Sequence, residues 1–412
     1  MRKTINLLAF LFAAASVAHA QVAPAATVGV AHFSYNFNYA QAAEFGGTLG
    51  NWQTISPSAS VDYANSAERL PFDLRYTGGY TATVSGPAYS TGLFQRLLLS
   101  QGFVGRKWKV TVSDDVSYRP QAPTTGFSGI PGIGEPIGSP TPPSSQSILT
   151  LRTHVVDNTV NGSVGDNLNY ATTLTFGGSS DLLRYPDGNG LSLNGQTANA
   201  GLVWRLNGRN SFSANYAFSQ FSYPDYSFSF VTSTVLFGFT RDWSRKLSTD
   251  VSVGPQLTSS SQSTSLPSST GTGIPSATGV SVRAVASYQF KFVTAALNYT
   301  HGVNGGSGYL FGAKSDDVIG TFSREFGRNL TIGFNGAYTR TTALANNTLI
   351  GTEFGGTQVS RRFGRHINVF ANYTARDQSS NSSLQANVIN SLLQTISFGV
   401  GYSPKKTEFI GQ

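Results

Sequence analysis

The stretch SREFGRNLTIGFNGAYTR (residues 323–340) returns in altered form as SRRFGRHINVFANYTAR (residues 360–376). In both copies a Gly-Arg element precedes a run in which apolar and polar residues alternate. After Arg328, the even-numbered positions from Leu330 to Tyr338 are mostly apolar, and the odd-numbered positions between them are polar or small. Alternation with a period of two is the pattern of a β-strand, because neighbouring side chains point to opposite faces. The repeat is therefore predicted to be a β-hairpin unit.

The same alternation recurs along most of the chain, and elements rich in Gly, Asn and Arg separate the runs. Gly and Asn tolerate the positive φ of tight turns, so these elements predict short connections. The connections at the other ends of the runs are longer and polar, such as the Ser/Thr tract 258–272 and the glycine-rich segment 305–308. The pattern predicts about eighteen strands, or about sixteen if one hairpin is misassigned. Predicted strands include 72–85, 155–167, 172–184 and 228–242.

The composition fits a barrel in a membrane. Charged residues make up 12% of the chain, against roughly 25% in ordinary soluble domains. Residues 1–20 combine Arg2-Lys3, an apolar run and an Ala-His-Ala cleavage site, which predicts a secretory signal peptide. The chain has no cysteine, which excludes disulfides and thiolate metal sites. We expect an all-β fold, a transmembrane antiparallel up-and-down β-barrel with short periplasmic turns and long extracellular loops.

Aromatic residues gather near the predicted strand ends, which suggests two girdles at the lipid–water boundaries. The group at the short turns is Trp108, Trp243, Phe326 and Phe363. The group at the long loops is Tyr118, Tyr185, Tyr223, Tyr299, Tyr338 and Tyr373.

With its signal peptide, alternating strands, short turns and closing phrase Ile396–Tyr402, the chain resembles bacterial outer-membrane β-barrel proteins, the porin-like group. The resemblance implies a barrel over 21–403 in the outer membrane of a Gram-negative bacterium. It also implies contact with outer-membrane lipid, and insertion by the barrel-assembly machinery, which in that group reads a terminal aromatic residue. Here Tyr402 is followed by Pro404 and a predicted periplasmic tail, 404–412, whose role stays open.

A barrel this wide leaves a water-filled lumen unless it is plugged. We therefore expect a channel for passive diffusion of small polar solutes. The alternative is a non-transporting surface, structural or adhesin-like barrel. No cofactor or nucleic-acid partner is expected, and the solute and the choice between monomer and trimer stay open.

The alternation also predicts which side chains face the lumen. The net positive charge and the arginines of this set favour a mild preference for anions. The candidates are Asp73, Arg75, Arg205, Arg283, Asn298, Asn335 and Asn372.

The segment 120–147 is rich in proline and glycine and is predicted to form an extracellular loop. It is either a free surface loop or a constriction loop folded into the barrel mouth. Its apolar residues favour the second reading, because free loops seldom carry so many. The constriction candidates are Phe127, Ile130, Ile133 and Ile137.

Enzymatic chemistry finds little support. His301 near a loop end is the one histidine suited to a barrel hydrolase, but no nucleophile motif accompanies it. The pairs Asp114-Asp115 and Asp316-Asp317 occupy adjacent strand positions, so their carboxylates point to opposite faces and cannot share a proton. Parity aims Asp114 at lipid, where a charge is costly. A bulge near Ser113, or a position beyond the membrane rim, would resolve this.

Overall fold

A computed structural model describes residues 28–45, 50–65, 67–86, 91–119, 122–123, 150–151, 153–188, 190–226, 228–260, 276–306, 310–345, 347–381, 391–404 and 407–410. The predicted signal peptide lies outside these residues. So does the segment 120–147, apart from Ala122–Pro123, whose backbone forms the short strand β6 and pairs with β7 (Thr150–Leu151).

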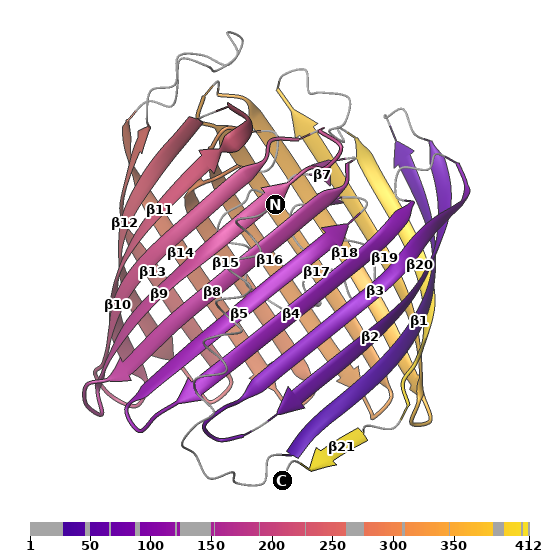
Figure 1. Ribbon diagram of the computed structural model, residues 1–412, viewed down its shortest axis with the longest axis horizontal. Coiled ribbons are helices and arrows are strands. Elements are labelled where there is room, and N and C mark those ends of the chain that lie inside the picture. Colours follow the sequence, from indigo (N-terminus) through magenta and orange to yellow (C-terminus); the bar gives the residue numbers. More distant parts are fainter. Residues whose placement is uncertain are drawn as a thin grey trace.

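The described residues form a closed barrel of eighteen antiparallel strands (Figure 1). The predicted all-β antiparallel barrel is thus confirmed, with eighteen strands in place of the alternative sixteen. The strands are β1 (Val28–Phe45), β2 (Asn51–Asn65), β3 (Phe72–Ser85), β4 (Gly92–Val104), β5 (Trp108–Arg119), β8 (Val155–Asn167), β9 (Thr172–Arg184), β10 (Leu193–Arg205), β11 (Asn210–Tyr223), β12 (Phe228–Asp242), β13 (Leu247–Ser260), β14 (Ala277–Phe290), β15 (Val293–Asn304), β16 (Ala313–Phe326), β17 (Leu330–Ala343), β18 (Leu349–Phe363), β19 (Ile367–Ser380) and β20 (Leu392–Tyr402).

Each barrel strand pairs with the next along the chain, and β5 pairs directly with β8. The barrel closes where β20 pairs antiparallel with β1, from Tyr35 opposite Tyr402 to Phe45 opposite Leu392. Beyond β20, the strand β21 (Thr407–Ile410) pairs with the first residues of β1. The sheet therefore continues into the segment predicted as a tail.

The two ends of the barrel differ. At one end, here called the turn end, connections are as short as 291–292, 327–329 and 364–366, and they lie at the bottom of Figure 1. The opposite end, here called the loop end, carries the longer connections, including 261–276 and 381–391. Glycine permits the tightest turns, since Gly327 and Gly364 have φ of 64° and 66°. Helical structure among the described residues consists of a single 3₁₀ turn, Pro224–Tyr226.

Among the described residues no helix is both long and apolar enough to cross a membrane.

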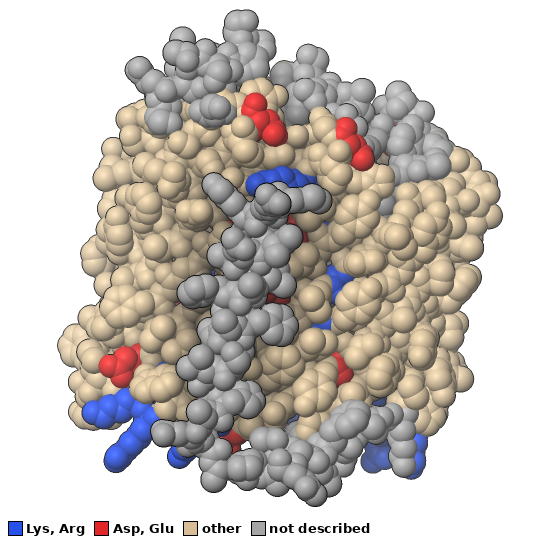
Figure 2. All heavy atoms as spheres, viewed as in Figure 1, with Lys and Arg blue, Asp and Glu red and all other residues tan. Residues whose placement is uncertain are grey.

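Side chains alternate between two faces of the wall. On β1, Phe33, Tyr35 and Phe37 are exposed on one face, while Asn38 of the other face is only 3% exposed. Figure 2 shows that the visible wall is largely uncharged between its ends, with most Lys and Arg of this view near the turn end. The exposed apolar face is the outer face, because side chains of the opposite face make hydrogen bonds across the barrel interior.

Candidate functional site: the loop-end interior of the barrel

In the connection between β15 and β16, the described residues 305–306 and 310–312 fold into the barrel. We call these residues the inward segment. These residues are buried, and Leu310 and Phe311 are only 3% and 7% exposed. Buried connections are unusual, because loops normally run over the surface. The inward segment is therefore a packed part of the structure.

Tyr223, the last residue of β11, holds both ends of the inward segment. Its hydroxyl donates to the Gly305 carbonyl at 2.7 Å and accepts the Gly312 N–H at 2.6 Å. The strands β12, β13 and β14 stand between β11 and β15, a path of roughly 19 Å along the wall at ~4.8 Å per strand. The hydrogen bonds therefore cross the barrel interior. This identifies the face that carries Tyr223 as the inner face.

Aromatic rings from β11, β12 and the inward segment pack on one another. The Phe311 ring lies 5.1 Å from that of Tyr223 and 6.0 Å from that of Phe228, both edge-on, and Phe221 stacks on Phe230 at 5.0 Å. Edge-to-face pairs at such distances stabilise by about 0.5–1.5 kcal/mol beyond simple burial. We call the inner face of β11 and β12 the aromatic wall. The cluster also contains Val155, Leu183, Tyr185, Leu193, Leu310, Ala313, Ala343 and Ile350.

Polar side chains fix the base of the inward segment. The Asn304 amide donates to the Ser315 hydroxyl at 2.8 Å, and its carbonyl accepts the Gly306 N–H at 2.9 Å. Ser315 in turn donates to Asp317 at 3.0 Å. Gly306 has φ of 72°, and a Cβ there would meet the Leu310 carbonyl oxygen at 2.3 Å. Glycine is therefore required for the segment to turn inward.

Ion pairs line a different part of the inner face, which we call the charged wall (β4, β5, β8 and β9). Arg96 donates two hydrogen bonds to Asp115, Nε to Oδ1 at 2.9 Å and Nη2 to Oδ2 at 2.6 Å. Arg119, only 4% exposed, lies 3.5 Å from Asp157. Thr159 donates to Asp181 at 2.8 Å. A bidentate Arg–carboxylate pair such as Arg96–Asp115 fixes geometry as well as charge.

The seven sequence-predicted lumen residues lie on several strands and do not form one cluster. Asp73 and Arg75 of β3 contact each other at 2.9 Å on the face opposite Tyr76. Arg283 of β14 is opposite Ser252 and Thr300. The three asparagines come from separate strands: Asn298 is 1% exposed, Asn372 donates to Ser397 at 3.3 Å, and Asn335 is opposite Thr321.

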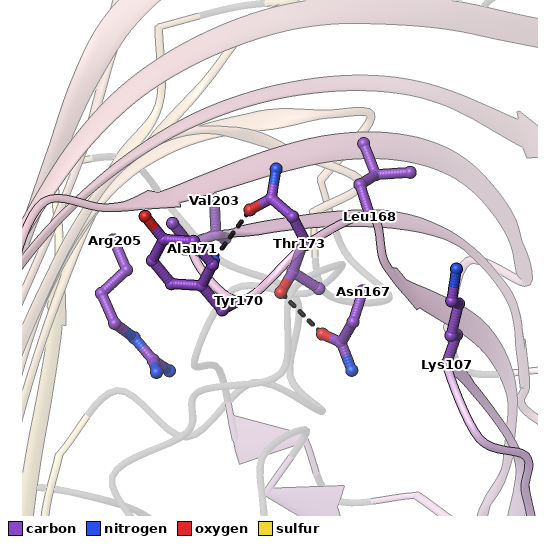
Figure 3. Close-up of a pocket in the computed structure, with 9 residues that line it drawn as sticks. Lys107, Asn167, Leu168, Tyr170, Ala171, Thr173, Val203 and Arg205 are labelled. Atoms are coloured by element: carbon purple, nitrogen blue, oxygen red, sulfur yellow. Dashed lines mark hydrogen bonds between the residues drawn. The ribbon is translucent and has the colours of Figure 1, made fainter.

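Arg205 is the last residue of β10 and lies at the turn end. It borders a pocket of about 530 Å³ that Lys107, Asn167, Tyr170 and Thr173 also line (Figure 3). Figure 3 shows Arg205 and Lys107 on opposite sides of this pocket, and Thr173 donates to Asn167 at 2.9 Å between them. Arg205 is thus far from the loop-end interior.

Two of the tyrosines assigned to the loop-end girdle are instead buried inside. Tyr223 is 1% exposed and Tyr185 is 5% exposed, both in the aromatic cluster. The prediction for these two was wrong because proximity to a strand end was weighed above parity. Tyr223 shares its parity with Ser213 and Ser219 on β11, the polar side of that strand. Parity was the signal that could have placed it correctly.

The inward segment was also missed. Its glycines at 305–308 were interpreted as a loose loop, although Leu310 and Phe311 lie only two and three residues beyond Gly308. The four predicted constriction residues, Phe127, Ile130, Ile133 and Ile137, lie outside the described residues.

Asp114 occupies an unexpected position. The register of β5 with β4 and with β8 runs without a shift, so a bulge near Ser113 is excluded. The Asp114 carboxylate instead accepts a hydrogen bond from the Asn158 amide at 2.7 Å. The neighbouring Asp115 lies on the charged wall, so Asp114 and Asn158 form a polar pair on the outer face. A hydrogen-bonded partner lowers the cost of a polar group there.

His301 also lies on the outer face, near the loop end. Its Nδ1 is 2.6 Å from Asp316, which also accepts a hydrogen bond from Tyr299 at 3.1 Å. Ser315 and Asp317, on either side of Asp316 in the chain, belong to the inner face. Within the described part of the chain, no hydroxyl group hydrogen-bonds to His301, and no three His, Cys, Asp or Glu residues gather as a metal site.

The loop-end connection between β9 and β10 is held to His154 by the Asp187 side chain. Asp187, in the connection between β9 and β10, lies 2.5 Å from the His154 ring and accepts the His154 N–H at 3.1 Å. Burial alone would raise the pKa of Asp187, but the hydrogen bonds from His154 outweigh it, so the pKa lies below its ordinary value of 3.8. The carboxylate is therefore favoured in the folded protein.

A closed antiparallel barrel with an apolar outer band and a polar inner face defines the class of transmembrane β-barrels. The fold is similar to that of several solved structures. OccK2 (OpdF) of Pseudomonas aeruginosa is 12% identical, with a TM-score of 0.49 over 93% of this chain and 98% of that one. OccK5 (OpdH) of the same organism is 10% identical, with a TM-score of 0.47 over 91% and 97%.

A BenF-like porin from Pseudomonas fluorescens Pf-5 is 11% identical, with a TM-score of 0.45 over 90% of this chain and 98% of that one. No protein-family model matches the sequence, and no curated protein matches it.

Proposed function

We propose that this protein is a passive channel for small polar solutes in the outer membrane of a Gram-negative bacterium. The observation that carries the proposal is a closed barrel of eighteen strands whose inner face bears polar and charged side chains. Barrels of sixteen to eighteen strands leave an aqueous lumen. In this proposal the turn end faces the periplasm and the loop end faces outward.

The inward segment sets the width of the path at the loop end. Its buried Leu310 and Phe311 take up space that solute would otherwise use, and Tyr223 holds them there. The charged wall provides hydrogen-bond donors and acceptors for polar solutes. In the proposal, residues 120–147 narrow the same mouth through Phe127, Ile130, Ile133 and Ile137.

The seven predicted lumen residues line the path, and Arg283 matters most for ion preference. Arg75 and Arg96 are each bound to an aspartate. Arg283 is exposed, and it has no carboxylate within 4 Å among the described residues. It stands midway along β14, so its positive charge acts on ions in the middle of the lumen. A mild preference for anions follows.

Planar-bilayer recording of the purified full-length barrel tests the proposal. We expect ion conductance, and a reversal potential in a salt gradient that favours anions and moves toward cations in Arg283→Gln. A matched control is Arg245→Gln, in the turn between β12 and β13, which should leave selectivity unchanged. A folded barrel that inserts but conducts no ions would contradict the proposal and favour the non-transporting surface protein.

A further inference from the structure

The outer wall beside the barrel seam carries an apolar groove. Its volume is about 350 Å³, and it lies across β18, β19, β20 and β1, which follow one another around the barrel (Figure 1). Among the residues lining it are Phe37, Val359, Val369, Ala371, Phe398 and Val400, with Arg361 at one end.

The register explains why a groove forms here. Val359, Ala371 and Phe398 stand side by side on three neighbouring strands, and Ala371 is the smallest of them. The side chains of Val359 and Phe398 therefore rise on either side of a low floor. Phe398 is 55% exposed and Phe37 is 51% exposed, so the walls of the groove project outward.

Arg361 lies at the turn-end limit of the groove. Its guanidinium carbon is 5.0 Å from the centre of the Phe363 ring, and Phe363 is the last residue of β18. A guanidinium that stacks on a ring keeps its N–H groups free at the edges. No carboxylate lies within 4 Å of Arg361 among the residues that the structure describes. The Arg361 guanidinium therefore lies at the membrane boundary, at the turn end of the apolar groove.

We propose that this groove is a phospholipid site, in which one acyl chain lies along Ala371 and the phosphate binds Arg361. Lipid tails are as apolar as the wall, so burial alone gives no preference for this place. Preference comes from the charge-assisted hydrogen bonds of the guanidinium with phosphate oxygens, combined with the shape of the groove. The proposal rests on the membrane placement given above, and not on conduction.

The same chain provides a matched comparison. Arg324 of β16 stacks on Phe326 at 4.7 Å, in the same Arg-x-Phe arrangement at the turn end. Above it, however, Phe322 and Phe334 are opposite each other and their rings contact at 6.2 Å. Beside Arg324, the rings of Phe322 and Phe334 occupy the positions that Val359 and Ala371 occupy beside Arg361. Arg324 therefore carries the same charge as Arg361 but, within the described part of the chain, has no apolar groove beside it.

Native mass spectrometry of the full-length barrel with dioleoyl phosphatidylglycerol tests the site. We expect tight lipid binding that falls about tenfold in Arg361→Gln, the scale of a lost charge-assisted hydrogen bond. Ala371→Phe, which fills the groove, should give a similar loss, and Arg361→Lys should retain part of the binding. Arg324→Gln should bind lipid as the unchanged protein does.

Thermal melting verifies that each variant is folded, and conductance measured in parallel separates lipid binding from channel function. Equal losses in Arg361→Gln and Arg324→Gln would show a general basic belt and overturn the site. Unchanged binding in a folded Ala371→Phe variant would also overturn it.

Discussion

Two parts of the inner face at the loop end do the same structural task by different means. The charged wall is fixed by ion pairs between neighbouring strands, such as Arg96 with Asp115. The aromatic wall is fixed by rings, and Tyr223 joins it to the inward segment across the lumen. Both are inner faces of the same barrel, yet one is built of polar and charged side chains and the other of apolar rings.

The difference shows what each part can contribute. Ion pairs between adjacent strands stay within the wall, so they leave the lumen open and give it charge. Ring packing extends away from the wall into the interior, because the inward segment between β15 and β16 supplies Phe311. In the proposed channel, the aromatic wall therefore narrows the path, and the charged wall lines it with paired charges.

The largest expected effect follows from removing the ring that packs the inward segment against the aromatic wall. Phe311→Ala leaves a cavity in the cluster, and such truncations cost about 3–5 kcal/mol where the site does not collapse. We expect the inward segment to detach and single-channel conductance to rise. Phe322→Ala on the outer face removes the same ring without touching the lumen and should leave conductance unchanged. Equal conductance in both variants would contradict a constriction by the inward segment.

Removing only the hydroxyl of Tyr223 should have a smaller effect. Tyr223→Phe leaves the Gly305 carbonyl and the Gly312 N–H without their shared partner, at a cost of about 1–3 kcal/mol. We expect more frequent conductance fluctuations with an unchanged mean level, because the ring still packs. Tyr216→Phe, on the exposed outer face of the same strand, is the control. If conductance fluctuations in Tyr223→Phe were as rare as in the unchanged protein, ring packing alone would hold the inward segment.

The charged wall should respond through selectivity. Arg96→Gln leaves the Asp115 carboxylate without its bidentate partner, and both side chains are part-exposed, so the expected loss of stability is only about 1 kcal/mol. The reversal potential should move toward cations. The double variant Arg96→Gln/Asp115→Asn should bring it back, because the two charges leave together. A shift that persists in the double variant would mean that the unpaired charge of Asp115 does not cause it.

The smallest effect concerns pH at the loop-end rim. The lowered pKa of Asp187 means that the hydrogen bonds it accepts from His154 stabilise the folded state above pH 3.8 and that this contribution is lost as the pH falls through the lower folded value. Asp187→Asn should therefore melt slightly earlier than the unchanged protein at about pH 6, and the difference should vanish at about pH 2. A melting difference that is independent of pH would assign the role of Asp187 to packing.

Much of this architecture could be predicted from the sequence. The predicted strands 72–85, 155–167, 172–184 and 228–242 match β3, β8, β9 and β12 in both limits. Local alternation suffices for this, because one side of every strand meets an apolar environment and the other a polar one. Asp115 and Asp317 could be assigned to a face opposite their neighbours for the same reason.

Alternation along one strand carries no information about contacts across a closed barrel. The composition and the period of two determined the class, the strands and the two faces of this protein. The tertiary structure alone decided that Tyr223 would meet Gly305 and Gly312, and that Asp114 would find Asn158 on the outer face. Those partners are distant in sequence and become neighbours only when closure fixes the register of all the strands, so their contacts depend on the whole barrel.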